Sequence, residues 1–282
     1  MEVDELKRII ETSEFNINNE LTSKLILNEN IIRRFQKTLD LIPLGNDKKI
    51  FVEIGCYAPW LSVYNQILHY SNFIAISYNE WDMLLKRFES LKTEGDIKLK
   101  VNICNIEKDN LEIENNSTDV VLLLEVIEHF SQDPMAVMAE INRILKTDGI
   151  LIITTPNAIS WSSLLSLLLG KNPVSEPYNG YDTNRHNRLY SPEEIIKFAY
   201  AAGFEIENCT TFDLDKSIHI QIAKFLICII DLPRFILVEK RIARIRGQII
   251  IAKLKKKSSI QDRYPKWLYK SYLYDLNQEK ND

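Results

Sequence analysis

Two carboxylates and an imidazole stand close together in the middle of the chain. Glu125, Glu128 and His129 follow directly after an apolar run at residues 117–124. A neutral imidazole can take a proton from a hydroxyl group near neutral pH, and a nearby carboxylate can hold a cationic ligand or orient the imidazole. Glu128 and His129 could equally serve only to fix the loop after the run, and the sequence does not separate these two roles.

Buried strands must hold these groups in place. Residues 117–124 are β-branched and leucine-rich without alternation, which is typical of a central parallel strand covered by helices on both faces. Such a sheet carries its chemistry just past the carboxyl ends of its strands. Asp133 and Pro134 predict the start of a helix, because Asp caps free N–H groups and Pro fits the first helical position. Residues 150–155 predict a second apolar strand, with Asn157 at its rim.

Further segments complete a predicted α/β fold. Residues 1–47 have helical periodicity and predict two helices, which could pack on the main domain or lie over the site. Ser191 and Glu194 form a capping box that predicts another helix. Trp161 and the leucines after it are expected in the core. The other predicted strands lie at 49–54, 72–76, 97–101, 204–211 and 246–252, and the other predicted helices at 80–91 and 215–244.

Composition excludes several classes of protein. A net charge of −4 and a pI near 5.7 give no electrostatic footprint for nucleic acid. Four widely spaced cysteines and a polar, acidic N-terminus predict reduced thiols and a cytoplasmic location. The apolar residues 218–238 are interrupted by charges and a proline, so no transmembrane segment is predicted. Peripheral membrane contact and a homodimer both stay open.

The order of motifs resembles that of class I S-adenosylmethionine-dependent methyltransferases. Members of that family often read D-V-V, then E-V-I-E-H, then E-x-x-R-x-L-K-x-x-G, then T-T-P-N, and residues 119–157 match all four in order and spacing. The resemblance implies a Rossmann-like seven-stranded mixed sheet, with six parallel strands, one antiparallel strand and helices on both faces. It also implies S-adenosyl-L-methionine as the cofactor and methyl transfer as the activity.

The resemblance further assigns the cofactor-binding residues. The family loop after the first strand normally reads E-x-G-x-G-x-G. Glu53 and Gly55 match it, whereas Tyr57 and Pro59 replace the later glycines without their conformational freedom. An aromatic residue and a proline also occur in this degenerate loop in members associated with surface-polysaccharide biosynthesis clusters, which the chain resembles. Ser77 stands where an acidic ribose ligand is usual. The other positions assigned to the cofactor are Cys56, Asn105, Ile106 and Glu125.

The loop at residues 170–190 predicts the acceptor side of the site. Loops of this length are commonly functional lids, and this one is rich in aromatic and basic residues. His186 is the first candidate for a base that accepts the proton of an acceptor hydroxyl, and His129 is the second. His186 could instead only support the lid. The substrate-binding candidates are Asn157, Tyr181, Arg188 and Tyr190.

These observations predict a domain order and a function. We expect an N-terminal helical extension at 1–47, a methyltransferase domain at 48–257 with the lid 170–190 and an apolar helical insertion at 215–244, and a C-terminal tail at 258–282. The expected activity is methyl transfer to oxygen of a small-molecule, glycan-linked or lipid-linked acceptor.

Two other functions are weighed against methyl transfer. A non-catalytic methyltransferase-like module that binds or scaffolds in polysaccharide assembly is the alternative, favoured by the degenerate loop and Ser77. A nicotinamide dehydrogenase ranks third, because its G-x-G-x-x-G turn is missing. No histidine and carboxylate cluster with metal-ligand spacing is visible along the sequence, so no metal is assigned.

Overall fold

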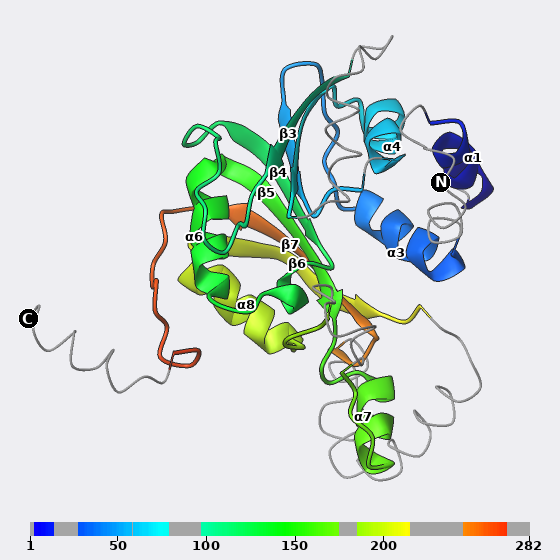
Figure 1. The fold of residues 1–282 in the computed structure, drawn as a ribbon, viewed down its shortest axis with the longest axis vertical. Coiled ribbons are helices and arrows are strands. Elements are labelled where there is room, and N and C mark those ends of the chain that lie inside the picture. Colours follow the sequence, from blue (N-terminus) through cyan, green and yellow to red (C-terminus); the bar gives the residue numbers. More distant parts are fainter. Residues whose placement is uncertain are drawn as a thin grey trace, which may run out of the picture.

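A seven-stranded sheet forms the centre of the molecule (Figure 1). The structure is a computed structural model that describes residues 3–13, 28–57, 59–78, 97–174, 185–214 and 245–269. The strand order is β3-β2-β1-β4-β5-β7-β6, and β7 alone runs opposite to the others, which confirms the predicted mixed sheet. The strands are β1 Ile50–Ile54, β2 Asn72–Ser77, β3 Lys98–Ile103, β4 Thr118–Leu124, β5 Leu145–Pro156, β6 Phe204–Phe212 and β7 Ile249–Lys256.

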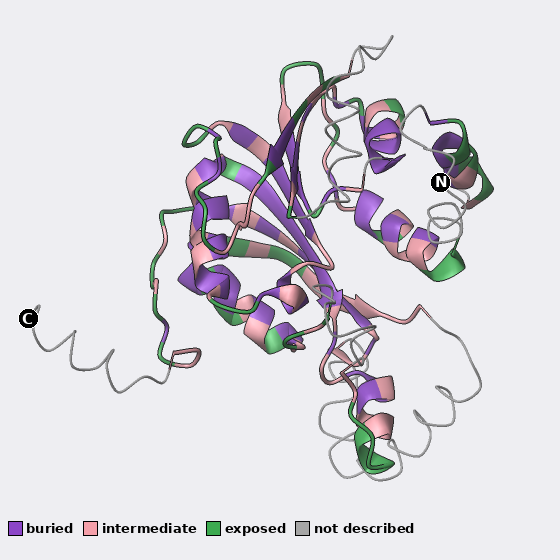
Figure 2. Ribbon diagram, in the orientation of Figure 1, coloured by how far each residue is buried: buried purple, intermediate pink, exposed green. Residues whose placement is uncertain are grey.

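Helices cover both faces of this sheet (Figure 1). One face carries α1 Val3–Glu11, α3 Glu29–Leu39 and α4 Pro59–Leu68, and the other carries α6 Pro134–Ile144 and α8 Pro192–Ala201. The side chains on both faces of β4 are therefore buried. Leu122 packs into the layer under α1, α3 and α4, whereas Leu123 packs into the layer under α6 and α8. This two-sided burial, visible along the central strands in Figure 2, explains why the β4 segment shows no polar alternation.

The two layers differ in chemistry. The layer under α3 and α4, here called the aromatic layer, contains stacked and edge-on rings: Phe35, Phe51, Trp60, Tyr64, Tyr70 and Phe73. The layer under α6 and α8, here called the aliphatic layer, is built mainly from aliphatic and methionine side chains that include Met135, Val137, Met138, Ile141 and Ile144. Full burial of such side chains stabilises the fold by about 1.5–3 kcal/mol each.

The start of α6 agrees with its sequence signals. The Asp133 carboxylate accepts hydrogen bonds from the backbone N–H groups of Met135 at 3.0 Å and Ala136 at 3.2 Å, and Pro134 is the first helical residue. Arg263 from the C-terminal segment also donates to Asp133, at 2.6 Å. The cap therefore orders both the helix and the described part of the tail.

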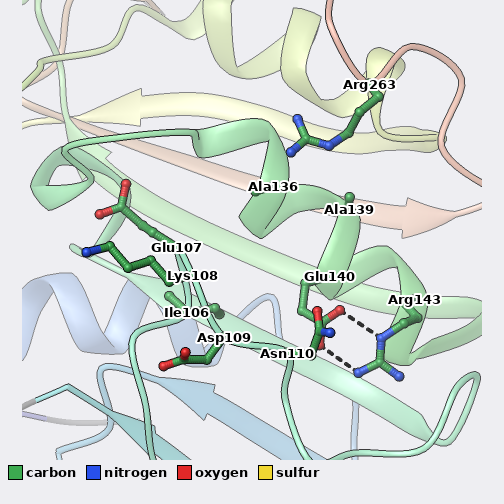
Figure 3. Close-up of a pocket in the computed structure, with 10 residues that line it drawn as sticks. All are labelled: Ile106, Glu107, Lys108, Asp109, Asn110, Ala136, Ala139, Glu140, Arg143 and Arg263. Atoms are coloured by element: carbon green, nitrogen blue, oxygen red, sulfur yellow. Dashed lines mark hydrogen bonds and ion pairs between the residues drawn. The ribbon is translucent and has the colours of Figure 1, made fainter.

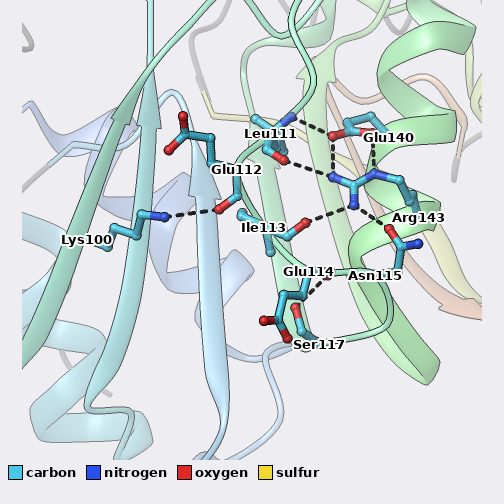
Figure 4. Close-up of polar contacts among 9 residues, drawn as sticks. All are labelled: Lys100, Leu111, Glu112, Ile113, Glu114, Asn115, Ser117, Glu140 and Arg143. Atoms are coloured by element: carbon cyan, nitrogen blue, oxygen red, sulfur yellow. Dashed lines mark hydrogen bonds and ion pairs between the residues drawn. The ribbon is translucent and has the colours of Figure 1, made fainter.

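A polar network fixes the segment that leads into β4 (Figure 4). The Arg143 guanidinium donates to the carbonyls of Leu111 at 3.0 Å and Ile113 at 2.8 Å, and it forms an ion pair with Glu140 at 2.6 Å. Glu140 in turn accepts the Leu111 backbone N–H at 2.6 Å. Glu140 and Arg143 thus form a structural brace within the motif E-x-x-R.

Several element boundaries differ from the sequence expectation. β5 starts at Leu145, and Asp148 adopts a left-handed φ of 62° inside it, where a turn before residue 150 was expected. β7 starts at Ile249, because Gly247 instead donates its N–H to the Thr211 hydroxyl at 2.9 Å. The Leu214 N–H also donates to the side chain of Gln248, at 2.9 Å.

The leucines of α7 Trp161–Leu168 correct another expectation. Trp161 is buried, but Leu167, Leu168 and Leu169 are 56–66% exposed rather than in the core. The reason is the position of α7, which extends beyond the strand ends (Figure 1). The helices predicted at 80–91 and 215–244 lie outside the described residues. Within the described ranges, no helix is long and apolar enough to cross a membrane.

Candidate active site

The carboxyl ends of four neighbouring strands bring the assigned cofactor residues to one edge of the sheet. Ile54 of β1 pairs with Ile76 of β2 and with Leu123 of β4. On the outer side of β2, Ser77 pairs with Ile103 of β3. The loops that follow these strands carry Gly55 with Cys56, Asn105 with Ile106, and Glu125. Their shared edge follows from the parallel order of β3, β2, β1 and β4.

Gly55 occupies a position that only glycine fits. Its φ is +73°, and its N–H donates to the carbonyl of Ile76 at 2.8 Å. A Cβ at this residue would lie 2.6 Å from Cγ2 of Val126. Pro59 begins α4, as the sequence allowed, and the ring of Tyr57 makes an edge contact with Trp60. The altered loop therefore retains its first glycine for a steric reason.

Glu53 is a buried carboxylate on the aromatic layer. The Tyr64 hydroxyl donates to its Oε1 at 3.0 Å. Burial raises the pKa of Glu53 to about 7, although hydrogen bonds from Cys56 and Tyr64 oppose that rise. The group can therefore change charge near neutral pH, and a cation bound beside it would favour the ionised form.

Glu125 meets a residue that the sequence did not assign to the site. Oε2 of Glu125 forms an ion pair with Arg34 of α3 at 2.9 Å, and Oε1 is buried without a hydrogen-bond partner among the described residues. Glu125 also has a left-handed φ of 55°, which is uncommon for a residue with a side chain. Of the two placements considered for the N-terminal helices, α1 packs on α4 whereas α3 also reaches the site. No signal in the sequence distinguishes Arg34 from other helical arginines.

The loop after β3 is ordered by its own polar groups. Asn105 accepts the Glu107 N–H on its side-chain oxygen at 3.0 Å, and Glu107 accepts the N–H groups of Ser131 at 3.1 Å and Gln132 at 2.7 Å. Glu107 therefore bridges the loops that follow β3 and β4. A cavity of about 310 Å³ opens between the loop after β3 and α6, with Ile106 in its lining (Figure 3).

Glu128 is the second deeply buried carboxylate at this edge. The hydroxyl of Thr155, in β5, donates to its Oε2 at 2.9 Å. Burial, reinforced by the charge of Glu125, raises the pKa of Glu128 to about 8. Thr155 was not singled out by sequence reasoning, although the T-T-P-N motif that contains it was.

Backbone hydrogen bonds join residues 187 and 188, at the end of the segment predicted as a lid, to the Glu128 loop. The N–H groups of Asn187 and Arg188 donate to the Glu128 carbonyl at 2.7 and 3.2 Å, and the Asn187 side chain donates to the His129 carbonyl at 2.7 Å. His186 is thereby held beside His129, with ring centroids 5.0 Å apart. Burial and the neighbouring His129 lower the pKa of His186, which favours its neutral form.

These hydrogen bonds create a cluster that the sequence alone did not reveal. Ligand atoms of Glu128, His129 and His186 lie within 4.8 Å of one another. Ligand spacing along the chain could not indicate this cluster, because the second histidine is far away in sequence and adjacent in space.

Two of the substrate-binding candidates, Asn157 and Tyr190, are buried and make internal contacts. Both N–H groups of the Asn157 amide are used, by the carbonyls of Ile245 at 2.8 Å and Gly247 at 2.7 Å, so Asn157 ties β5 to the start of β7. The Tyr190 side chain is 1% exposed and packs edge-on against Phe198, inside the aliphatic layer. Neither side chain is available to an acceptor.

The other substrate-binding candidates have different outcomes. Arg188 forms an ion pair with Glu194 at 2.5 Å and keeps 43% of its side chain exposed. Tyr181 lies outside the described residues.

The chain is similar to several known proteins in sequence and fold. Residues 27–208, more than half of the chain, match the model of a family described as a methyltransferase domain. A protein of Mycolicibacterium smegmatis described as a probable S-adenosylmethionine-dependent methyltransferase is 30% identical over 98 residues, which are 35% of this chain. The match spans about a third, 33%, of the length of that curated relative.

Solved structures share the fold at low sequence identity. A SAM-dependent methyltransferase from Archaeoglobus fulgidus is 16% identical, with a TM-score of 0.51 over 79% of this chain and 92% of the other. An S-adenosylmethionine-dependent methyltransferase from Mesorhizobium loti is 13% identical, with a TM-score of 0.51 over 79% and 97%. A geranyl diphosphate methyltransferase in complex with SAM is 14% identical, with a TM-score of 0.50 over 86% and 93%.

Proposed function

The chain belongs to the methyltransferase-domain family, and on that premise we propose that it transfers a methyl group from S-adenosyl-L-methionine to an acceptor oxygen. The acceptor is a small molecule or a glycan-linked or lipid-linked compound of surface-polysaccharide biosynthesis. The observation that carries the proposal is the family match over residues 27–208, which contain the polar loops at the carboxyl ends of β1 to β4.

The residues at that edge fit the cofactor. Gly55 turns the chain beside β2 with a left-handed φ of +73°, and Oε1 of Glu125 is a buried acceptor without a partner in the described residues. Glu53 can become a carboxylate beside a cationic amino group. Bound S-adenosyl-L-methionine supplies a methyl group on a positively charged sulfur, which is already a good leaving group. The remaining residues proposed to line its site are Cys56, Tyr57, Ser77, Asn105 and Ile106.

The protein must align the acceptor and remove its proton. Orientation in line and exclusion of water account for most of what methyl transfer demands of a protein. An oxygen acceptor also requires a proton acceptor, for which we propose His186 first and His129 second. The neutral form of His186 is the form that can accept a proton.

The lid and the exposed leucines support the proposed acceptor class. We propose that residues 170–190 close over the acceptor, with Tyr181 and Arg188 among its contacts, inside a methyltransferase domain at 48–257. Leu167, Leu168 and Leu169 present apolar surface next to this lid, which would suit a lipid-linked acceptor or peripheral membrane contact. Binding to phospholipid vesicles that is lost when the three leucines are replaced by serine would support this part of the proposal.

Cofactor binding separates the proposal from its alternative, a non-catalytic module. Isothermal titration should give heat with both S-adenosyl-L-methionine and its demethylated product. Gly55→Ala should abolish that heat, because the new Cβ meets Val126. Gly170→Ala is the matched control, since Gly170 also has a left-handed φ, +69°, but a Cβ added there would have no other atom within 4 Å. Absence of heat with both ligands in the unchanged protein would favour the module.

Acceptor identity is tested by following the methyl group. Extracts that contain sugar-linked and lipid-linked compounds are incubated with isotope-labelled donor and the protein, and products are identified by mass spectrometry. His186→Asn should retain donor binding and lose transfer. Transfer at an unchanged rate in this variant and in His129→Asn would remove the histidines from the reaction.

A further inference from the structure

The side chains of Glu128, His129 and His186 are potential metal ligands, and they face a common gap beyond the carboxyl ends of the strands. Nε2 of His129 lies 3.9 Å, and Nε2 of His186 4.0 Å, from Oε1 of Glu128. These separations are too long for direct hydrogen bonds. The three side chains therefore converge without bonding to one another, although all of their ligand atoms lie within 4.8 Å.

The carboxylate oxygen that faces this gap lowers the stability of the protein as long as it has no hydrogen-bond partner. Glu128 has an exposed fraction of 0%, and its Oε1 has no hydrogen-bond partner in the part of the chain that the structure describes. A buried polar oxygen without a partner costs roughly 1–3 kcal/mol. A species that bonds to Oε1 and to both imidazoles would remove this cost.

Neighbouring groups already orient the ligands. Nδ1 of His129 lies 3.0 Å from the carbonyl of Arg185, which can only accept, so Nδ1 carries the hydrogen and Nε2 presents a lone pair. The Thr155 hydroxyl holds the other oxygen of Glu128. Hydrogen bonds of this kind, from a ligand histidine to a carbonyl and to a ligand carboxylate, are typical outer contacts of metal sites.

We propose that Glu128, His129 and His186 bind one divalent transition-metal ion of the Zn²⁺ class. Two imidazole nitrogens and one carboxylate oxygen form a donor set known from catalytic zinc sites, whereas Mg²⁺ favours oxygen ligands. Metal–ligand bonds of about 2.0–2.2 Å place tetrahedral ligand atoms roughly 3.4 Å apart. Small side-chain rotations would close the observed 3.9 and 4.0 Å to that spacing.

An ion held by three protein ligands keeps a coordination position open. It would lower the pKa of an acceptor hydroxyl that reaches this position, and the histidines would then act as ligands rather than as free bases. The acceptor oxygen would give its proton to water and form the new O–C bond as the C–S bond breaks with its electrons left on sulfur. This consequence rests on the proposed function, whereas binding of the ion does not.

Metal titration of the full chain tests the site. Protein stripped with a chelator is titrated with Co²⁺, followed by visible absorption, and with Zn²⁺, followed by calorimetry. We expect one equivalent of Zn²⁺ per chain and much weaker binding of Mg²⁺. His129→Asn and His186→Asn should each weaken Zn²⁺ binding at least tenfold. His69→Asn is the matched control, because His69 is exposed and has a left-handed φ of 62° that asparagine tolerates.

Thermal unfolding guards against misfolded variants. Zn²⁺ should raise the Tm of the unchanged protein and of His69→Asn, but not that of His186→Asn, since a ligand stabilises only the form that binds it. Lack of saturable binding, or equal affinity in all variants, would overturn the metal site and leave a bridging water as the occupant of the gap. Specific Zn²⁺ binding without methyl transfer to any acceptor would support the site and count against the proposed function.

Discussion

Glu53 and Glu128 are two buried carboxylates near the ends of neighbouring strands, but they face different layers of the molecule. Glu53 lies on the aromatic layer, with the Tyr64 hydroxyl as donor, and Glu128 lies on the aliphatic side, with Thr155 as donor and two histidines opposite. Burial raises the pKa of each, to about 7 and about 8. Equal burial therefore gives two similar acids, and their neighbours determine what each can do.

The surroundings suggest a division of labour. We propose Glu53 as the carboxylate that binds a cationic ligand, since the phenol and thiol groups around it donate hydrogen bonds and do not readily accept its proton at neutral pH. Glu128 faces imidazoles that can exchange protons or share a metal ion. Two separate motifs of the family, one at the end of β1 and one after β4, thus place the two carboxylates toward opposite layers of one sheet.

Activity should separate the two carboxylates most strongly. In Glu128→Gln we expect kcat to fall by about 10²–10⁴-fold, which is the typical contribution of a general base, because Glu128 faces the two histidines proposed for that role. The donor Kd should change by less than about threefold. In Glu53→Gln we expect the opposite pattern, a donor Kd raised by about tenfold, equivalent to about 1.4 kcal/mol, with a smaller change in kcat. Initial rates and calorimetry measure both quantities. Equal effects of the two variants on kcat and Kd would remove the proposed division.

The pH dependence of stability should carry the signature of Glu53. Its pKa is raised from 4.5 to about 7 in the folded protein, so the folded state binds more protons than the unfolded state between these values. The contribution of Glu53 to the free energy of unfolding should therefore fall by roughly 3 kcal/mol as the pH rises from 4.5 to 7 and then level off, whereas Glu128 adds a fall in the same direction that continues to about pH 8. Glu53→Gln should reduce the slope between pH 4.5 and 7 in urea denaturation and leave the part that belongs to Glu128. An unchanged slope in the variant would remove Glu53 from the pH dependence.

Removal of the hydroxyl that donates to each buried carboxylate should show how much each hydrogen bond contributes to stability. Tyr64→Phe and Thr155→Val keep the side-chain shape but take away the donor to Glu53 or Glu128. Each should lower the free energy of unfolding by about 1–3 kcal/mol. Tyr200→Phe is the control, since Tyr200 is 60% exposed and its loss of a hydroxyl should change stability by less than about 0.5 kcal/mol.

The smallest expected effect concerns Arg34, which forms an ion pair with Glu125. Arg34→Met should change stability by less than about 1 kcal/mol, because the ion pair is partly exposed. It should nevertheless tighten binding of the cationic donor by about two- to tenfold, because a competing positive charge is removed. Arg33→Met, which breaks a pair with Glu29 on the outer face of the same helix, should leave donor binding unchanged. Weaker donor binding in Arg34→Met would make Arg34 a binding residue.

Much of the fold could be predicted because its signals are local or periodic. The run at β4, the cap at Asp133 and the conformational demand at Gly55 each depend on a few adjacent residues. The order of the motifs, through the family resemblance, then predicted the seven-stranded mixed sheet. Position along the chain also identified Glu53 and Glu125 as strand-end carboxylates.

The remaining features depend on contacts between distant segments. Arg34 reaches Glu125 only because α3 packs over the aromatic layer, and His186 reaches Glu128 only through backbone hydrogen bonds from residues 187 and 188. Asn157 and Tyr190 have residue types common in binding sites, yet tertiary packing uses both internally. Residue type alone cannot tell a group that lines a site from one that supports it.

The hydrogen bonds between the residues that end or follow β6 and those that precede β7 have a consequence for the segment that they enclose. Thr211 meets Gly247, and Leu214 meets Gln248, so the chain returns to its point of departure on either side of residues 215–244. The entropy cost of closing such a loop grows only logarithmically, by about 0.6 kcal/mol for each doubling of its length. We therefore expect this position to tolerate insertions and deletions, while the two strands that flank it keep their register.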